Sequence, residues 1–198
     1  MRRSMTLVAL LAGLATSLSA QASGTAPDTS SGSRITFGYN LYLSPQMWPE
    51  VGADDDQKFG LGLGGMIGVA WILGDMKIVA GPHMSYNMWT ADYSNKPNSA
   101  TQSVSFGMAD VGAEILLHFD DDMGFWMGAG NSTMDASMLL ANGTTFYYPG
   151  LHQASFPYKS VGVTFRLGRK ARFGLGVTKY DGAADDATRA EFRLGIGY

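Results

Sequence analysis

The sequence predicts an all-β fold, an eight-stranded antiparallel transmembrane β-barrel of the bacterial outer-membrane type. Eight segments alternate polar and apolar side chains with a period of two, which is typical of strands with one apolar face. Short turns and longer loops alternate between these segments, as they do at the two ends of an outer-membrane barrel. The 198-residue chain also contains 26 glycines and no cysteine.

The N-terminal residues resemble an export signal. Two arginines precede a short apolar stretch, and Ala20-Gln21-Ala22 has the small residues of a cleavage site, so residues 1–22 are predicted to be a signal peptide. An uncleaved anchor is the alternative, but the apolar stretch is short for a membrane span. Residues 23–32 are rich in Ser, Thr and Gly and are expected to form a mobile tail. The barrel is then assigned to residues 33–198.

The first two predicted strands have apolar residues at alternate positions. In residues 34–43, Ile35 and Phe37 share a face opposite Thr36 and Gly38. Residues 58–72 alternate large apolar side chains with glycine, which argues against a helix because glycine disfavours helices.

The other six strands follow the same pattern. Residues 76–90 set Met84 and Tyr86 against polar residues, and 103–117 alternate with a change of phase near Met108–Asp110 that predicts a β-bulge. The remaining predicted strands are 124–130, 158–167, 172–180 and 188–198.

The connections give the barrel a direction. Tight turns at 73–75, 119–123 and 168–171 would face the periplasm, and the longer loops would face outside. The last strand ends on Tyr198 and resembles the signal that the barrel-assembly machinery recognises. A soluble lipocalin-type barrel is the competing interpretation, but its outer face should be polar. We therefore expect a multi-pass barrel in the outer membrane, and a monomer.

Composition excludes several kinds of function. A chain without cysteine has no thiolate metal site and no cysteine nucleophile, and a net charge of −3 without a basic block argues against nucleic acid. The spacing of Gly60, Gly62 and Gly65 matches a dinucleotide motif, but no helix follows, so no cofactor is expected. His118 lies beside Asp120–Asp122 in a predicted solvated turn, so no metal site is expected.

The inward faces contain both charges and many glycines. Glycine leaves space in a small barrel, which predicts either a pocket open to the outside or a lumen into which Tyr42, Tyr158 and Tyr180 lean. The periplasmic half is expected to be plugged by charge pairs and one large ring, contributed by Arg34, Glu114, Arg166, Arg172 and Trp126.

A polar cluster on the third strand is the candidate catalytic site. His83, Ser85 and Asn87 share a face, and folding the strands about their loop puts Asp110 roughly opposite His83. An imidazole that takes a serine proton while a carboxylate orients the ring is an arrangement that activates a hydroxyl. The alternative is a polar interior without chemistry. His152 and Ser155 in the third long loop form a second candidate pair.

Proline interrupts strand pairing because it lacks an N–H group. Pro82 lies in the middle of the third strand, where it could mark a lateral gap that admits an acyl chain. Pro45, Pro49 and Pro157 are predicted at strand ends, where proline is tolerated.

Ser85-Tyr86-Asn87-Met88-Trp89 resembles the Ser-aromatic-Asn-x-Trp stretch of the lipid A palmitoyltransferases, and Ile35-Thr36-Phe37 is also similar. The resemblance covers about a third of the mature chain. It implies an eight-stranded outer-membrane enzyme that moves a palmitoyl chain from a phospholipid to lipid A, with Ser85 as the catalytic serine. Two positions depart from the family: Met84 replaces an acid, and Gly38 falls near the place of its histidine.

The first functional hypothesis is therefore a lipid A acyltransferase whose partners are phospholipid and lipid A. Ser85 and His83 would perform the transfer, Asp110 would orient His83, and Asn87 would stabilise the oxyanion. The alternative is a non-enzymatic small barrel, either structural or a conduit for small apolar molecules. A lipid A deacylase is a further alternative, since His83-x-Ser85 has the spacing of such enzymes.

Overall fold

The protein folds into a β-barrel in the computed structural model, which describes residues 34–48, 58–93, 102–119, 122–139, 144–147, 152–182 and 187–197. The predicted signal peptide, the predicted tail and Pro49 lie outside these residues. The strands are β1 (Arg34–Trp48), β2 (Lys58–Leu73), β3 (Met76–Tyr93), β4 (Gln102–His118), β5 (Met123–Leu139), β6 (Thr145–Tyr147), β7 (Ala154–Arg166), β8 (Ala171–Tyr180) and β9 (Thr188–Gly197).

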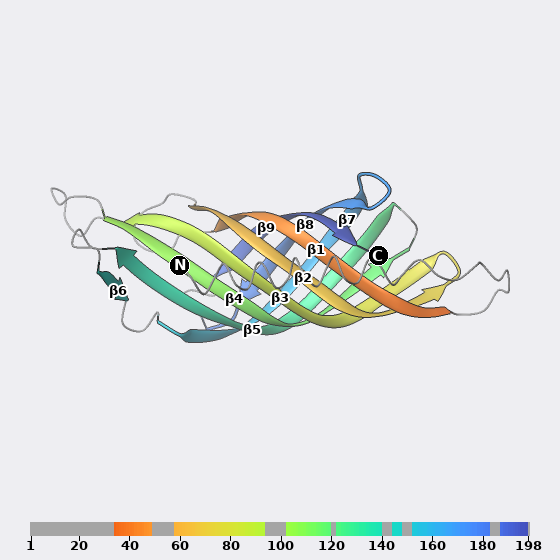
Figure 1. The fold of residues 1–198 in the computed structure, drawn as a ribbon, viewed down its shortest axis with the longest axis horizontal. Coiled ribbons are helices and arrows are strands. Elements are labelled where there is room, and N and C mark those ends of the chain that lie inside the picture. The colour runs from red at the N-terminus through yellow and green to blue at the C-terminus, as the bar shows by residue number, and fades with distance from the viewer. Residues whose placement is uncertain are drawn as a thin grey trace. The chain divides into compact units, whose positions relative to one another are not determined.

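Eight long strands close the barrel. Neighbours pair antiparallel from β1 through β5, then β5 pairs with β7, and β9 pairs back to β1. β6 has three residues and pairs only with the end of β5 among the described strands (Figure 1). The predicted closed antiparallel barrel of eight strands is confirmed. No described segment is a helix that is long and apolar enough to cross a membrane.

Apolar side chains cover the outside of the barrel. Phe37, Leu61 and Met84 are 49%, 49% and 46% exposed, whereas their neighbours in sequence Gly38, Gly62 and Ser85 are buried. A wall of this kind is stable only in contact with lipid, and a closed barrel leaves no strand edge unpaired in the hydrocarbon. The protein is therefore an outer-membrane β-barrel, as the alternation predicts.

Two details of the predicted strands are wrong. The pairing of β3 with β4 is continuous from Lys77 opposite His118 to Tyr93 opposite Gln102, so no bulge interrupts it. The apparent change of phase arises because the apolar residues Val104 and Met108 face the lumen and are buried. The fifth strand continues to Leu139, beyond its predicted end at residue 130.

Proline acts at two places in the wall. The β2–β3 pairing runs from Gly60 opposite Trp89 to Met66 opposite His83 and resumes at Val69 opposite Ala80, so it is interrupted beside Pro82, as expected. β2 and β3 nevertheless stay close together at this point. A Cβ atom on Gly81 of β3 would overlap the carbonyl oxygen of Ile67 on β2.

Pro45 is not at a strand end, contrary to prediction. It lies inside β1, which continues to Trp48. The β1–β9 pairing stops at Leu43 opposite Leu194 and resumes at Gln46 opposite Glu191. A second interruption therefore lies at this seam of the barrel. Pro157 lies near the start of β7, as predicted.

Candidate functional site

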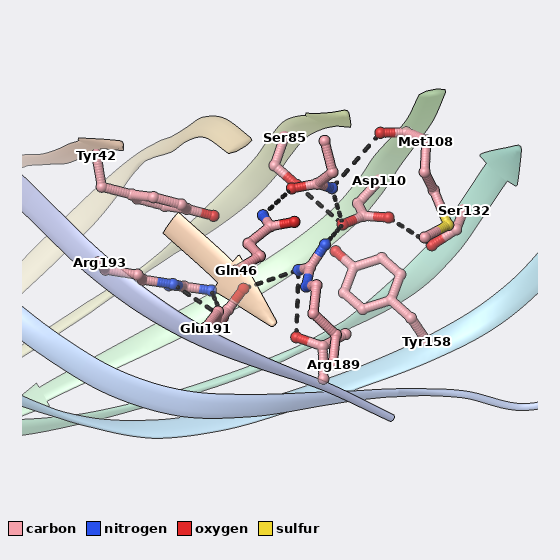
Figure 2. A network of polar contacts seen from close by, with 12 residues as sticks. Tyr42, Gln46, Ser85, Met108, Asp110, Ser132, Tyr158, Arg189, Glu191 and Arg193 are labelled. Atoms are coloured by element: carbon pink, nitrogen blue, oxygen red, sulfur yellow. Dashed lines mark hydrogen bonds and ion pairs between the residues drawn. The ribbon is translucent and has the colours of Figure 1, made fainter. Parts of the chain in front are cut away.

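Asp110 on β4 is the centre of a buried polar network in the lumen. Its Oδ2 accepts hydrogen bonds from Ser85 Oγ at 2.9 Å and from Asn87 Nδ2 at 2.8 Å, and its Oδ1 accepts one from Ser132 Oγ at 2.6 Å. Figure 2 shows Asp110 between Ser85 and Ser132, which come from the two neighbouring strands. The hydroxyl of Tyr180 also donates to Oδ2, at 3.3 Å. The carboxylate is thus held by donors from three strands.

A chain of alternating charges continues from this centre. Arg189 lies 3.4 Å from Asp110 and 2.8 Å from Glu191, both measured between a guanidinium nitrogen and a carboxylate oxygen. Arg193 joins Glu191 at 3.0 Å to Glu114 at 2.6 Å. All five side chains are buried, and each carboxylate lies within ion-pair distance of at least one of the two guanidinium groups, with one carboxylate in excess. Buried charges are tolerated when they are paired in this way.

Aromatic rings support the same chain. The guanidinium carbon of Arg193 lies 4.3 Å from the ring centre of Tyr42 and 4.2 Å from that of Trp126, which is within the range of a cation–π contact. Trp126 is fully buried, as is required of the large ring predicted for this half of the lumen. Arg193 is therefore fixed both by its two acids and by packing.

His83 lies beside the network but contacts other partners. Its Nε2 is 2.6 Å from the Tyr42 hydroxyl and its Nδ1 is 3.1 Å from the Tyr158 hydroxyl. Glu114 Oε2 lies 3.9 Å from Nε2. Both ring nitrogens thus contact tyrosine hydroxyls, and the His83 residue as a whole is 3% exposed.

The predicted catalytic arrangement is not formed. Asp110 lies opposite Ser85, and His83 lies opposite Gly112, so the predicted pairing of Asp110 with His83 is wrong by two residues of register. Such a shift keeps every side chain on its face and changes only its partner. Ser85 therefore donates to the carboxylate directly, with no imidazole between them.

Asn87 is also engaged. Its Nδ2 donates to Ser85 Oγ at 3.2 Å and to Asp110 Oδ2, and its Oδ1 accepts a hydrogen bond from Gln46. The amide protons that an oxyanion would need are therefore used within the network. The structure brings Ser85, Asn87 and Asp110 together and places His83 apart from them.

The space beside the inward glycines is filled. A Cβ atom on Gly64 would overlap Tyr42, one on Gly162 would overlap Trp126, and one on Gly130 would lie 2.8 Å from Tyr158. Beside these glycines the lumen is filled by large side chains that lean across it, as the alternative predicts, and the predicted open pocket is not formed there. A cavity at the periplasmic end, beside Arg193 and His118, has about 20 Å³, enough for about one water molecule.

Other predicted site residues lie elsewhere. Glu114 and Trp126 occupy the periplasmic half as predicted, but Arg34 and Arg166 are exposed at its rim and the partner of Glu114 is Arg193. Arg172 is half-buried. His118 is the last residue of β4 and is buried, which corrects its assignment to a solvated turn.

His152 and Ser155 do not form a pair. His152 Nδ1 is 2.7 Å from Asp135 Oδ1 on the outer side of β5, and the Gln153 backbone donates to the same oxygen at 2.9 Å. Ser155 is exposed on β7. Among the described residues, no group of three His, Asp or Glu side chains is placed to hold a metal ion.

The charged side chains of the last strand were not among the predicted site residues. Charged residues alternate with apolar ones in this strand, at Arg189, Glu191 and Arg193. This alternation in a predicted membrane strand could have identified them as lumen residues. Three charges at every second position of a strand whose other face is apolar must point into the lumen.

Comparisons with known proteins concern the fold alone. No family model and no curated protein matches the sequence, so the resemblance to the lipid A palmitoyltransferases gains no support. Among solved structures, Ail of Yersinia pestis, crystallised with a heparin analogue, is 14% identical with a TM-score of 0.46, over 85% of this chain and 99% of that one.

Two further structures are similar at the same level. The N-terminal β-barrel domain of Pseudomonas aeruginosa OprF is 8% identical, with a TM-score of 0.49, over 81% of this chain and 97% of that one. Neisserial surface protein A is 13% identical, with a TM-score of 0.46, over 83% and 97%. No activity or partner is transferred from any of them.

Proposed function

We propose that this chain is a non-enzymatic outer-membrane barrel, a rigid anchor whose lumen is sealed by its own side chains. The observation that supports this most strongly is the use of the candidate catalytic groups as structural partners. Ser85, Asn87 and Asp110 bond to one another and to Ser132 and Arg189 inside a buried network. Such a network stabilises one arrangement of the lumen.

The geometry argues against acyl transfer. A serine nucleophile needs a base that takes its proton and a donor pair that is free for the oxyanion. His83 is hydrogen-bonded to Tyr42 and Tyr158 instead, and the amide of Asn87 is engaged. An acyl chain entering the lumen would have to displace Tyr42 or Trp126, which are 4% and 0% exposed.

The layers of the lumen argue against a conduit for apolar molecules. One apolar cluster contains Trp89, Met108, Tyr158 and Tyr180, and a second is built around Trp126 with Met66, Ala70, Val79 and Leu116. The charged chain connects Asp110, beside the first cluster, to Arg193, which stacks on Trp126. An apolar solute would therefore have to break buried ion pairs, which is costly.

A sealed barrel can present structure outside the membrane. On β5 the outward residues beyond Ala129 are Asn131, Thr133, Asp135 and Ser137, so this part of the wall faces water. β6 extends the same wall, and Asp135 binds the chain at His152 and Gln153. We propose that the membrane-spanning part holds this external platform in place.

The test is acyl transfer by the folded protein. Purified barrel in mixed micelles receives a phospholipid with a labelled palmitoyl chain together with lipid A, and mass spectrometry follows the lipid A products. We expect no product above the level obtained with Ser85→Ala. The conservative change Ser132→Ala is the matched control, because it removes another hydroxyl that donates to Asp110.

Acylated lipid A that forms with the wild type and with Ser132→Ala, but not with Ser85→Ala, would overturn the proposal. Comparison of the lipid A acyl patterns of cells with and without the gene tests for acyl transfer in the native membrane. Under the proposal, the two acyl patterns are identical.

A further inference from the structure

One of the three short turns differs from the others in charge. The β7–β8 turn contains Arg169 and Lys170, both exposed, and Arg172 follows at the start of β8. The β2–β3 turn contains Asp75, and Asp122 directly precedes β5. The β7–β8 turn is thus positively charged, and Arg34 and Lys77 place further cations at the starts of β1 and β3.

The basic turn has a defined shape. The Leu167 N–H donates to the Ala171 carbonyl at 2.9 Å, which brings these two residues together and leaves Arg169 and Lys170 at the tip. The side chain of Arg166, at the end of β7, donates a hydrogen bond to the Gly168 carbonyl at 2.9 Å. These hydrogen bonds hold the backbone of the turn that carries the two cationic residues.

An apolar groove begins at the same turn. It has a volume of about 380 Å³ on the barrel surface and is lined by both residues that flank the turn, with Arg172 among the lining residues. Its other apolar walls come from β1, β2 and β9, and include Leu43, Leu63, Leu194 and Ile196. Leu43, Leu194 and Ile196 are 50%, 49% and 48% exposed, so they face the lipid.

We propose that this turn and groove bind one anionic phospholipid of the inner leaflet. Its phosphate would lie against Arg169, Lys170 and Arg172, and one acyl chain would lie in the groove. The periplasmic ends of outer-membrane barrels are the ends with short turns, so the site faces the leaflet that contains phospholipid headgroups. Charge complementarity selects an anionic headgroup, because each Lys or Arg near such a headgroup raises affinity about fivefold. This inference is independent of whether the lumen is catalytic.

The experiment is native mass spectrometry of the folded full chain released from detergent with phosphatidylglycerol or phosphatidylethanolamine of the same acyl chains. We expect one phosphatidylglycerol to be retained in preference to phosphatidylethanolamine. The double variant Arg169→Gln/Lys170→Gln should lose about 25-fold in affinity for phosphatidylglycerol, at about fivefold for each charge. Both positions are exposed turn residues, so the fold should be retained.

Lys159→Gln/Lys179→Gln is the matched control, because it removes the same charge from exposed lysines at the other end of β7 and β8. It should bind phosphatidylglycerol as the wild type does. Equal losses in the two double variants would mean a general charge effect and would overturn the site. Equal retention of the two phospholipids, preferential retention of lipid A, or full displacement of phosphatidylglycerol by inorganic phosphate would also overturn it.

Discussion

Ser85 Oγ donates a hydrogen bond to Asp110 Oδ2 at 2.9 Å, across directly paired positions of β3 and β4. This contact replaces the serine–imidazole contact on which acyl-transfer chemistry depends. Asp110 also accepts from Asn87, Ser132 and Tyr180 and pairs with Arg189, so the serine is one donor among several. The residues most suggestive of catalysis therefore hydrogen-bond to one another within a buried network.

The first prediction concerns the two ends of this hydrogen bond. Asp110→Ala removes the acceptor of all these donors and should destabilise the barrel by about 3–5 kcal/mol, as breaking a buried charge network does. Ser85→Ala removes one donor and should cost about 1 kcal/mol. Urea-induced unfolding in phospholipid vesicles measures both. Equal losses of stability in the two variants would contradict a network centred on Asp110.

The second prediction concerns Arg193. Arg193→Met keeps much of the side-chain volume but leaves Glu114 buried without its guanidinium partner and Glu191 with Arg189 alone, so it should cost about 3–5 kcal/mol. Adding Glu114→Gln should recover part of that loss, because the carboxylate that lost its guanidinium partner becomes neutral. The same unfolding assay applies, and the account fails here if the double variant is less stable than Arg193→Met.

Lys159→Gln is the control for Arg193→Met. It removes an ion pair with Asp181 in which the lysine side chain is 73% exposed. Pairs at the surface are screened by water, so this change should cost less than about 1 kcal/mol.

The third prediction concerns the fit of Trp126 against glycine. A Cβ atom at Gly162 would overlap the indole ring, so Gly162→Ala should cost about 1–3 kcal/mol through overpacking. Combining it with Trp126→Phe, which shortens the ring, should cost less than the sum of the two single changes. Strict additivity in a double-mutant cycle would show that the two residues do not share this space.

The fourth prediction concerns the external platform. Asp135→Ala removes the acceptor of His152 Nδ1 and of the Gln153 N–H, where Gln153 has a left-handed φ of 56°. Limited proteolysis of intact cells should then cut between β6 and β7 faster than in the wild type. The unfolding midpoint of the barrel should not change, because the contact lies outside the lumen. A lower midpoint with unchanged proteolysis would place Asp135 in the barrel core instead.

Much of the barrel was predictable from the sequence because membrane strands alternate strictly. Phe37 and Leu61 face lipid and Gly38 and Gly62 face the lumen, as the period of two requires. The pattern failed where the environment changes along one strand. Asn131 to Ser137 continue β5 outside the lipid, where polar residues replace the apolar ones and remove the signal.

The site was less predictable because its contacts depend on register and on filling of the lumen. Folding the strands about the centre of their loop places Asp110 opposite His83, whereas the pairing places it opposite Ser85. Glycine positions likewise show where space exists but not what occupies it, and Trp126 fills the space at both its paired residue Gly162 and at Gly176 on the next strand. Such contacts follow only from the packed barrel.

The central claim is that the lumen is closed by side chains, and ionic current across a planar lipid bilayer tests it most directly. Trp126→Ala is the comparison, because it removes the largest fully buried side chain of the lumen. A closed lumen predicts no steady conductance for the folded wild type and measurable conductance for Trp126→Ala. A steady conductance of the wild type equal to that of the variant would contradict it.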